Sequence, residues 1–325
     1  MALQTVPTVD YHDFISGDAE KRANFIQNLG DAFSQIGFVI VKNHGVSEEL
    51  RQELFQISKE IFAQPVAIKQ QYEDVNNGGQ RGYISKGRET AKGEKVPDLK
   101  EFWHIGQNVT DEPELKAEYP ENIWMNEVPQ MQAVGLKIYQ TFESTGRNLL
   151  RAIALYLGLD ENYFDAKIHN GNSILRLLHY YPVKNLDEIE EGAVRAAAHG
   201  DINLITLLMG GSAKGLQAQN SDGEWVDVSP QENEIVINIG DMLQRHTNGR
   251  LKSTIHRVIN LDKEAMLHPR YSAPFFLHPR SDMDLSCLDS CISDAAPKAY
   301  EDITAGEFLA ERIRELGLLK KNDTM

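Results

Sequence analysis

Beyond Asn172 the chain becomes a series of short β-rich runs separated by turn residues, and this pattern limits the possible folds most strongly. The runs are SILRLLHYY, NLITLLM, GLQAQ, EWVDV, EIVINI, STIHRVINL and RYSAPFFL. Asn220-Ser221-Asp222-Gly223 and Thr247-Asn248-Gly249 are turn signals, and the second suits a hairpin. Closely spaced strands without intervening helices are typical of an antiparallel sandwich or barrel.

The part of the chain before these runs mixes helical and extended patterns. A helix is predicted between Ser47, a suitable N-cap, and Pro65, a stop, from the helical spacing of Leu50, Leu54, Ile57 and Ile61. A longer helical region runs from about Pro129 to Leu157, and Gly146 allows a break or bend within it. Val39-Ile40-Val41 indicates a short strand. We therefore expect helices to cover the β-rich part.

The chain ends with one more helical pattern, which a capping box introduces at Thr304-Ala305-Gly306-Glu307. No internal repeat, low-complexity tract or long linker divides the sequence. We expect a single unit over residues 1–325, a β-rich α+β fold with a barrel-like core wrapped by helices. Its approximate regions are a mixed α/β segment, a helical segment, the β core and the C-terminal helix, at residues 1–110, 111–170, 171–290 and 303–320.

Charge and cysteine content exclude several classes of partner. The formal net charge of −15 argues against nucleic acid. The N-terminal stretch lacks the basic start and apolar run of a signal peptide, and no apolar run approaches the roughly 20 residues of a membrane span. Cys287 and Cys291 are the only cysteines, which suits a reducing compartment. The sequence predicts a soluble cytoplasmic protein.

One candidate metal site stands out in the β-rich part. His199 and Asp201 lie two residues apart, so on an extended strand both side chains would point to the same face. His256, in the later run STIHRVINL, could supply a second imidazole. Two histidines and one carboxylate with open positions are typical of non-haem iron(II) oxygenases. On spacing alone, a surface Asp201 and a hydrogen-bonded core His199 explain the pattern equally well, and His246 is the next ligand to consider.

Arg270 and Ser272 form a candidate anion site. On a strand they share a face and offer a guanidinium fork and a hydroxyl, which suit a carboxylate. A buried arginine is costly without an anionic partner. The alternative is an arginine at the barrel rim that pairs with an aspartate, which an acidic protein provides easily.

Ten motifs in order resemble an iron(II)/2-oxoglutarate-dependent dioxygenase of the isopenicillin N synthase-like family. They are VPTVDY, GFVIVKNHGV, RGY, DLKEFWHIG, LRLLHYYP, HGDINLITLL, GLQ, VINIGDMLQRHTNGRLKSTIHRV, RYSAPFF and TAGEFLAERI. The family fold is a double-stranded β-helix (jelly-roll) core with flanking helices, which agrees with the run of strands. One departure is Met209-Gly210-Gly211-Ser212, where the family often has Gln-Asp.

The resemblance implies roles for particular residues. His199, Asp201 and His256 would ligate iron(II), and this metal site would itself be the catalytic centre. Arg270 and Ser272 would hold the distal carboxylate of 2-oxoglutarate, the co-substrate. Oxidative decarboxylation with O2 would give succinate and CO2 and would drive hydroxylation or a related oxidation of a small molecule. Ascorbate is the expected activator in vitro.

Two further assignments are less determined by the sequence. Tyr180 reaches the cofactor if the strand is aligned from Arg176, and Tyr181 does so if it is aligned from Pro182; strand alternation favours Tyr180. The candidate substrate pocket suits a small planar or anionic molecule and consists of Arg81, Tyr83, Phe102, His104, Arg176 and Phe276. Simple core packing is the alternative for each of these pocket residues.

Two other functions remain open at this point. Relatives in the same family are iron-dependent oxidases that keep the Arg-x-Ser pair but do not use 2-oxoglutarate. A non-catalytic metal- or ligand-binding barrel is the second alternative. The intact set of three ligands together with the Arg270–Ser272 pair disfavours it.

Overall fold

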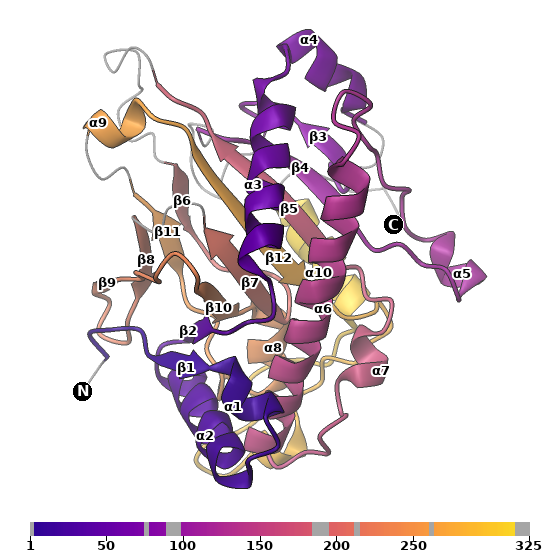
Figure 1. Ribbon diagram of the computed structural model, residues 1–325. Coiled ribbons are helices and arrows are strands. Elements are labelled where there is room, and N and C mark those ends of the chain that lie inside the picture. Colours follow the sequence, from indigo (N-terminus) through magenta and orange to yellow (C-terminus); the bar gives the residue numbers. More distant parts are fainter. Residues whose placement is uncertain are drawn as a thin grey trace.

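The computed structural model describes residues 3–74, 78–88, 99–183, 195–210, 215–259 and 263–315, and two sheets dominate it (Figure 1). The larger sheet has the order β1-β2-β10-β7-β12-β5-β4-β3, and the smaller one has the order β6-β11-β8-β9. Strands of the larger sheet are β1 (Thr8–Asp10), β2 (Phe38–Lys42), β3 (Gly82–Ile84), β4 (Glu101–Gly106), β5 (Ile174–Tyr180), β7 (Ile205–Gly210), β10 (Ile235–Ile239) and β12 (Arg270–Leu277). Those of the smaller sheet are β6 (Ala196–His199), β8 (Leu216–Gln219), β9 (Trp225–Asp227) and β11 (His256–Val258).

Helices border the larger sheet. They are α1 (Tyr11–Ile15), α2 (Ala19–Gln35), α3 (Glu48–Ala63), α4 (Val66–Lys69), α5 (Pro113–Lys116), α6 (Met131–Tyr156), α7 (Asp165–Ile168), α8 (Asp241–His246), α9 (Lys263–Met266) and α10 (Ala305–Glu315), with 3-10 turns at Gln70–Tyr72 and Asp289–Cys291. Contacts join α2 to β2, α3 to β5, and α6 to β4, β7 and β12. Within the described residues, no helix is both long enough and apolar enough to cross a membrane.

Strand alternation gives the larger sheet two different faces. The outer face packs under α2, α3 and α6, and its side chains include Val39, Leu175, Leu207, Ile237 and Phe275. The inner face packs against the smaller sheet, and the cluster between the sheets joins Phe38, Ile40 and Val236 to Ala196, Leu216, Ala218 and Val258. Residues of even number on β5, β7, β10 and β12 therefore share the inner face. The expected β-rich core with flanking helices is confirmed.

The predicted helix boundaries are confirmed where local signals set them. Ser47 accepts a hydrogen bond from the N–H of Leu50 at the start of α3, which ends just before Pro65. Thr304 and Glu307 form the expected capping box at the start of α10. The predicted residues 316–320 of that last helix lie outside the described residues. Gly146 does not break α6, which continues through it. The glycine instead allows close packing, because a Cβ at this position would clash with Cδ1 of Leu277 on β12.

The hairpin expected at Asn248-Gly249 is wrong. Both residues adopt positive φ, at 51° and 77°, and they follow the short helix α8. The Asn248 amide donates hydrogen bonds to the carbonyls of Cys291, Ala296 and Pro297. The strands on either side, β10 and β11, belong to different sheets, so the left-handed pair ends a helix rather than closing a hairpin. Asn220–Gly223 does join two paired strands, β8 and β9.

Candidate metal centre and anion site

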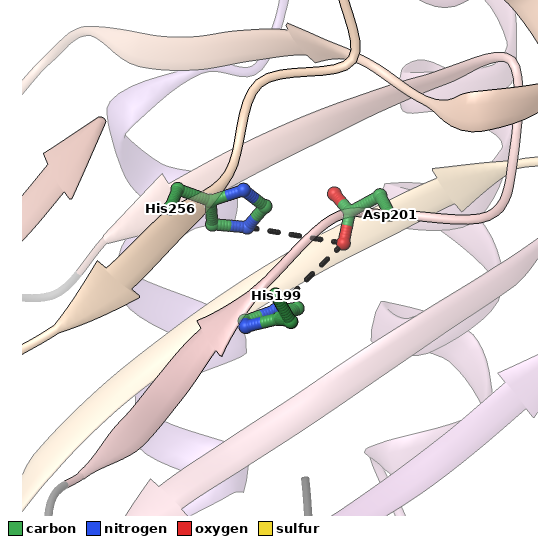
Figure 2. Close-up of side chains that lie close together, drawn as sticks. All are labelled: His199, Asp201 and His256. Atoms are coloured by element: carbon green, nitrogen blue, oxygen red, sulfur yellow. Dashed lines mark ion pairs between the residues drawn. The ribbon is translucent and has the colours of Figure 1, made fainter. Parts of the chain in front are cut away.

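The three predicted metal ligands converge at the edge of the smaller sheet. His199 ends β6 and His256 begins β11, and the two residues are direct cross-strand partners. Their Nε2 atoms each lie 3.9 Å from Oδ1 of Asp201, and Figure 2 shows all three side chains turned toward one another. One ligand atom from each residue falls within 4.8 Å of the others. Asp201 lies beyond the end of β6, so strand alternation alone does not account for its position.

Backbone carbonyl groups orient both imidazoles. Nδ1 of His199 lies 2.7 Å from the Ala197 oxygen, and Nδ1 of His256 lies 3.1 Å from the Thr254 oxygen. A carbonyl oxygen only accepts, so each Nδ1 carries the proton and donates it. The Nε2 lone pair of each ring is therefore available on the side of Asp201, as a metal ligand requires.

Two polar side chains from the larger sheet hold the carboxylate of Asp201. Its Oδ2 accepts hydrogen bonds from the Thr206 hydroxyl at 2.5 Å and from the Asn238 amide at 2.8 Å. Thr206 on β7 and Asn238 on β10 are cross-strand partners on the inner face. Sequence reasoning missed both residues. The available signal was one polar residue inside each apolar run, NLITLL and VINI.

The electrostatics of the centre favour ligand-competent forms. Burial lowers the pKa of His199 to about 4, and the neighbouring His256 adds to this effect. Burial by itself would raise the pKa of Asp201, but the two imidazoles and the hydrogen bonds from Asn238 and Thr206 lower it overall. At neutral pH His199 is neutral and Asp201 is ionised. These forms, with borderline and hard donor atoms, fit a divalent transition metal such as iron(II).

His246, the alternative metal ligand, forms hydrogen bonds away from the metal site. Its Nδ1 lies 2.7 Å from the Ser286 carbonyl oxygen, and its Nε2 lies 2.9 Å from the Tyr163 hydroxyl. Both ring nitrogens therefore already have hydrogen-bond partners within the core.

Arg270 supplies a buried cation on the inner face of β12. The residue is only 7% exposed, and Nε and Nη1 have no hydrogen-bond partner within the part of the chain that the structure describes. Burial lowers the pKa of Arg270, although the group remains a cation at neutral pH. The alternative to an anion site, an ion pair between Arg270 and an aspartate at the barrel rim, does not form among the described residues. Two unused guanidinium N–H groups in a buried position fit the carboxylate of an anionic ligand such as 2-oxoglutarate.

The structure separates the two candidate tyrosines. Tyr180 is the cross-strand partner of Arg270, and its ring centroid lies 5.4 Å from Cζ of that arginine. Ser272 follows on the same face as Arg270, opposite Leu178. The ring of Tyr181 instead lies 3.9 Å from Nζ of Lys86, and the nearby Glu101 contributes, after burial, to its raised pKa. Tyr180 is therefore the tyrosine beside the buried cation.

Four of the expected pocket residues come together. Phe102 and His104 on β4 lie beside Arg176 on β5. Cζ of Arg176 lies 4.1 Å from the centroid of Phe102 and 5.2 Å from that of Phe276. Its Nε donates to Nε2 of His104 at 2.8 Å, while Nδ1 of His104 donates to the Gly79 oxygen at 2.6 Å. The guanidinium is thus held between two aromatic rings on the inner face.

The expectation that Arg81 and Tyr83 line the same pocket is wrong. Tyr83 points to the outer face, where its hydroxyl donates to the buried carboxylate of Glu101. Arg81 has no exposed surface, and its guanidinium occupies the place that a side chain at Gly106 would take. Tyr83 is the cross-strand partner of Trp103, and both side chains belong to the core cluster on the outer face, whereas Ile84 and its partner Phe102 lie on the inner face. Sequence spacing alone could not reveal this register between β3 and β4.

The comparisons with known protein families agree with this geometry. A model described as the 2OG-Fe(II) oxygenase superfamily matches residues 171–279. A second model, described as the N-terminal part of the non-haem dioxygenase in morphine synthesis, matches residues 6–127.

Curated relatives cover nearly the whole chain. A 2-oxoglutarate-Fe(II) type oxidoreductase of Emericella nidulans is 30% identical over 95% of this chain and 89% of its own length. A proline hydroxylase of Petromyces alliaceus is 32% identical over 95% of this chain and 98% of its own.

Solved structures are similar to the same extent. A protein of Caulobacter crescentus, described as a 2OG-Fe(II) oxygenase family member, has a TM-score of 0.86 and 40% identity over 97% of this chain and all of its own. A full-length Neurospora crassa protein in complex with alpha-KG and thymine has a TM-score of 0.84 and 31% identity over 95% of this chain and 96% of its own.

Proposed function

The chain belongs to the 2OG-Fe(II) oxygenase superfamily, and on this premise we propose that His199, Asp201 and His256 hold the iron and that Arg270 holds the co-substrate. The protein is an iron(II)- and 2-oxoglutarate-dependent oxygenase that uses O2. Within the superfamily we place it in the isopenicillin N synthase-like family, which its ten ordered motifs support. The observation that carries the residue assignment is the convergence of three ligand atoms within 4.8 Å.

An iron(II) ion held by His199, Asp201 and His256 would supply the redox chemistry that couples the oxidative decarboxylation of 2-oxoglutarate, which yields succinate and CO2, to the oxidation of a second, small-molecule substrate by O2. The protein contributes positioning. Thr206 and Asn238 occupy Oδ2 of Asp201, so Oδ1 is left to face the Nε2 atoms of His199 and His256. Three protein ligands would leave other coordination positions open to the co-substrate and O2, as a 2-His-1-carboxylate site does.

The anion site lies on the inner face of the larger sheet, the face that also carries Thr206 and Asn238, which hydrogen-bond to Asp201. Arg270 offers two unused N–H donors, and Ser272 adds a hydroxyl two residues further along β12. The ring of Tyr180 covers the guanidinium from the neighbouring strand. We assign to this group the distal carboxylate of 2-oxoglutarate, because that end of the molecule is not needed at the metal.

Arg176, with Phe102, His104 and Phe276, is the proposed contact surface for the prime substrate. A guanidinium between two aromatic rings favours a small planar molecule that carries a carbonyl or an anionic group. The thymine and 5-formyluracil complexes of the similar Neurospora crassa protein support this class of substrate.

The test is succinate formation from 2-oxoglutarate in air with iron(II) and ascorbate, first without any other substrate and then with a panel of small molecules that includes thymine. We expect slow succinate formation in the absence of another substrate, and faster succinate formation when planar heterocycles are added. His256→Ala is the matched negative variant and should abolish both while the protein stays folded. Near-wild-type succinate formation by His256→Ala would contradict the ligand assignment.

A further inference from the structure

A second buried guanidinium lies beside the anion site. Arg195 immediately precedes β6 in the smaller sheet, whereas Arg270 opens β12 in the larger sheet. Both approach the ring of Tyr180: Cζ of Arg195 lies 5.8 Å from its centroid, and Cζ of Arg270 lies 5.4 Å from it. Arg195 as a whole residue is only 9% exposed. The two sheets thus each bring one cation to the same aromatic ring.

The two cations disfavour one another in this position. Burial lowers the pKa of Arg195, and the charge of Arg270 lowers it further. Like charges in a poorly solvated site repel, and an anion placed near both relieves the repulsion. Nη2 of Arg195 lies 3.4 Å from the carbonyl oxygen of His268, which anchors the side chain two residues before Arg270. Arg195 makes further contacts as well, so its position and charge are what matter here.

We propose that Arg195 is the second cation of the 2-oxoglutarate site and acts on the distal carboxylate through its charge. This proposal rests on the assignment of Arg270 to the same carboxylate. The hydrogen bonds of Arg270 and Arg195 indicate different roles for the two residues. Arg270 has two unused N–H groups and can grip the carboxylate directly, whereas one end of Arg195 is turned toward a backbone carbonyl. If Arg195 acts only through its positive charge and not through the two-pronged geometry of its guanidinium, a lysine at this position can replace it.

The experiment compares two oxo acids that differ only at the distal end. The dissociation constants of 2-oxoglutarate and 2-oxopentanoate, which ends in a methyl group, are measured by anaerobic calorimetry on the iron(II)-loaded protein. Arg195→Met should raise the dissociation constant of 2-oxoglutarate about tenfold and leave that of 2-oxopentanoate within about twofold, because only the former has a distal charge. Arg195→Lys should stay within about threefold of the wild type for both acids.

Two further variants serve as controls. Arg195→Gln keeps a donor for the His268 carbonyl without the charge and should behave like Arg195→Met. Arg250→Met removes an exposed arginine that lies 5.1 Å from the ring of Tyr156, and it should change neither dissociation constant. Melting temperatures of all variants are recorded.

Equal weakening of both acids in Arg195→Met and Arg195→Gln, or no weakening of either, overturns the proposal. A loss in Arg195→Lys as large as in Arg195→Met also overturns it, because charge is then not the cause. Failure of the proposed function looks different. In that case the wild type does not prefer 2-oxoglutarate over 2-oxopentanoate, or Arg270→Ala keeps the preference.

Discussion

At the scale of single residues, the carboxylate of Asp201 depends on two neighbours that do not touch the metal. Asn238→Leu removes the amide donor to Oδ2, and Thr206→Val removes the hydroxyl donor with little change in shape. Loss of such supporting hydrogen bonds typically lowers metal affinity about tenfold to a hundredfold. We expect this weakening for iron(II) or manganese(II), measured by anaerobic calorimetry. Thr141→Val, which removes a hydroxyl bonded to a helix carbonyl on α6, is the control; equal affinities in Thr206→Val and Thr141→Val would contradict the role.

Arg270 allows geometry and charge to be separated at one position. Arg270→Lys keeps the charge but loses the planar fork, and Arg270→Ala loses both. Charge-assisted hydrogen bonds contribute about 1.5–3 kcal/mol, so Arg270→Ala should weaken the binding of 2-oxoglutarate by up to roughly a hundredfold. Arg270→Lys should lose less affinity than Arg270→Ala, and Ser272→Ala should lose the least. The measurement is succinate yield against 2-oxoglutarate concentration, with iron affinity determined separately and expected to stay unchanged. An unaltered 2-oxoglutarate dependence in Arg270→Ala refutes the assignment.

At the scale of elements, the contact between α2 and α6 depends on the absence of a side chain at Gly30. A Cβ at Gly30 would lie 2.1 Å from ring atoms of Tyr156, whose hydroxyl donates to Asp31. Alanine in place of glycine favours a helix by about 1 kcal/mol, but overpacking typically costs about 1–3 kcal/mol. Because the Tyr156 ring is packed against α2 and its hydroxyl is bonded to Asp31, it cannot move aside easily, so we expect overpacking to dominate and Gly30→Ala to lower the free energy of unfolding in urea.

The same contact provides its own control. In a Tyr156→Leu background the clash is largely removed, so Gly30→Ala should there be neutral or stabilising. The difference between the two backgrounds measures the coupling between the helices. Equal effects of Gly30→Ala in both backgrounds would show that the contact does not limit stability.

At the scale of the whole molecule, buried histidines should make folding sensitive to mild acid. Burial lowers the pKa of His44 and of His246, and it lowers the pKa of His278 to about 4, against a weaker opposing effect of Asp201. In the unfolded chain each has an ordinary pKa near 6.5. Between pH 6.5 and about 4 the unfolded chain therefore binds more protons, so the free energy of unfolding falls as the pH falls through this window.

The measurement uses metal-free protein with a chelator, so that proton competition for the metal does not contribute. Urea unfolding at pH 7 and pH 5 should show a clear loss of stability at the lower pH. His278→Gln should reduce that loss by about 2 kcal/mol, because one imidazole whose protonation the folded state disfavours is removed. His12→Gln, at an exposed position, is the control. An unchanged loss in His278→Gln would contradict this account of His278.

Much of the fold follows from the sequence because it depends on local signals. The Ser47 cap, the stop before Pro65 and the Thr304–Glu307 capping box act within a few residues of themselves, and each sets a helix boundary as expected. The runs beyond Asn172 are short, rich in β-branched and apolar residues and bounded by turn residues, so they predict strands without intervening helices. The motif order was sufficient for the family and hence for the cofactors.

The tertiary structure decided what depends on distant partners. The hydrogen bonds of Thr206 and Asn238 place Asp201, and pairing with Arg270 on β12 distinguishes Tyr180 from Tyr181. Pairing with Trp103 on β4 puts Tyr83 on the outer face, away from the expected pocket, and the approach of two sheets sets Arg195 near Arg270. Local backbone preferences extend over a few residues, whereas the face and partner of a side chain are set by pairing between segments far apart in the chain. That is why the sequence contained the site residues, and only the folded chain determined which of them meet.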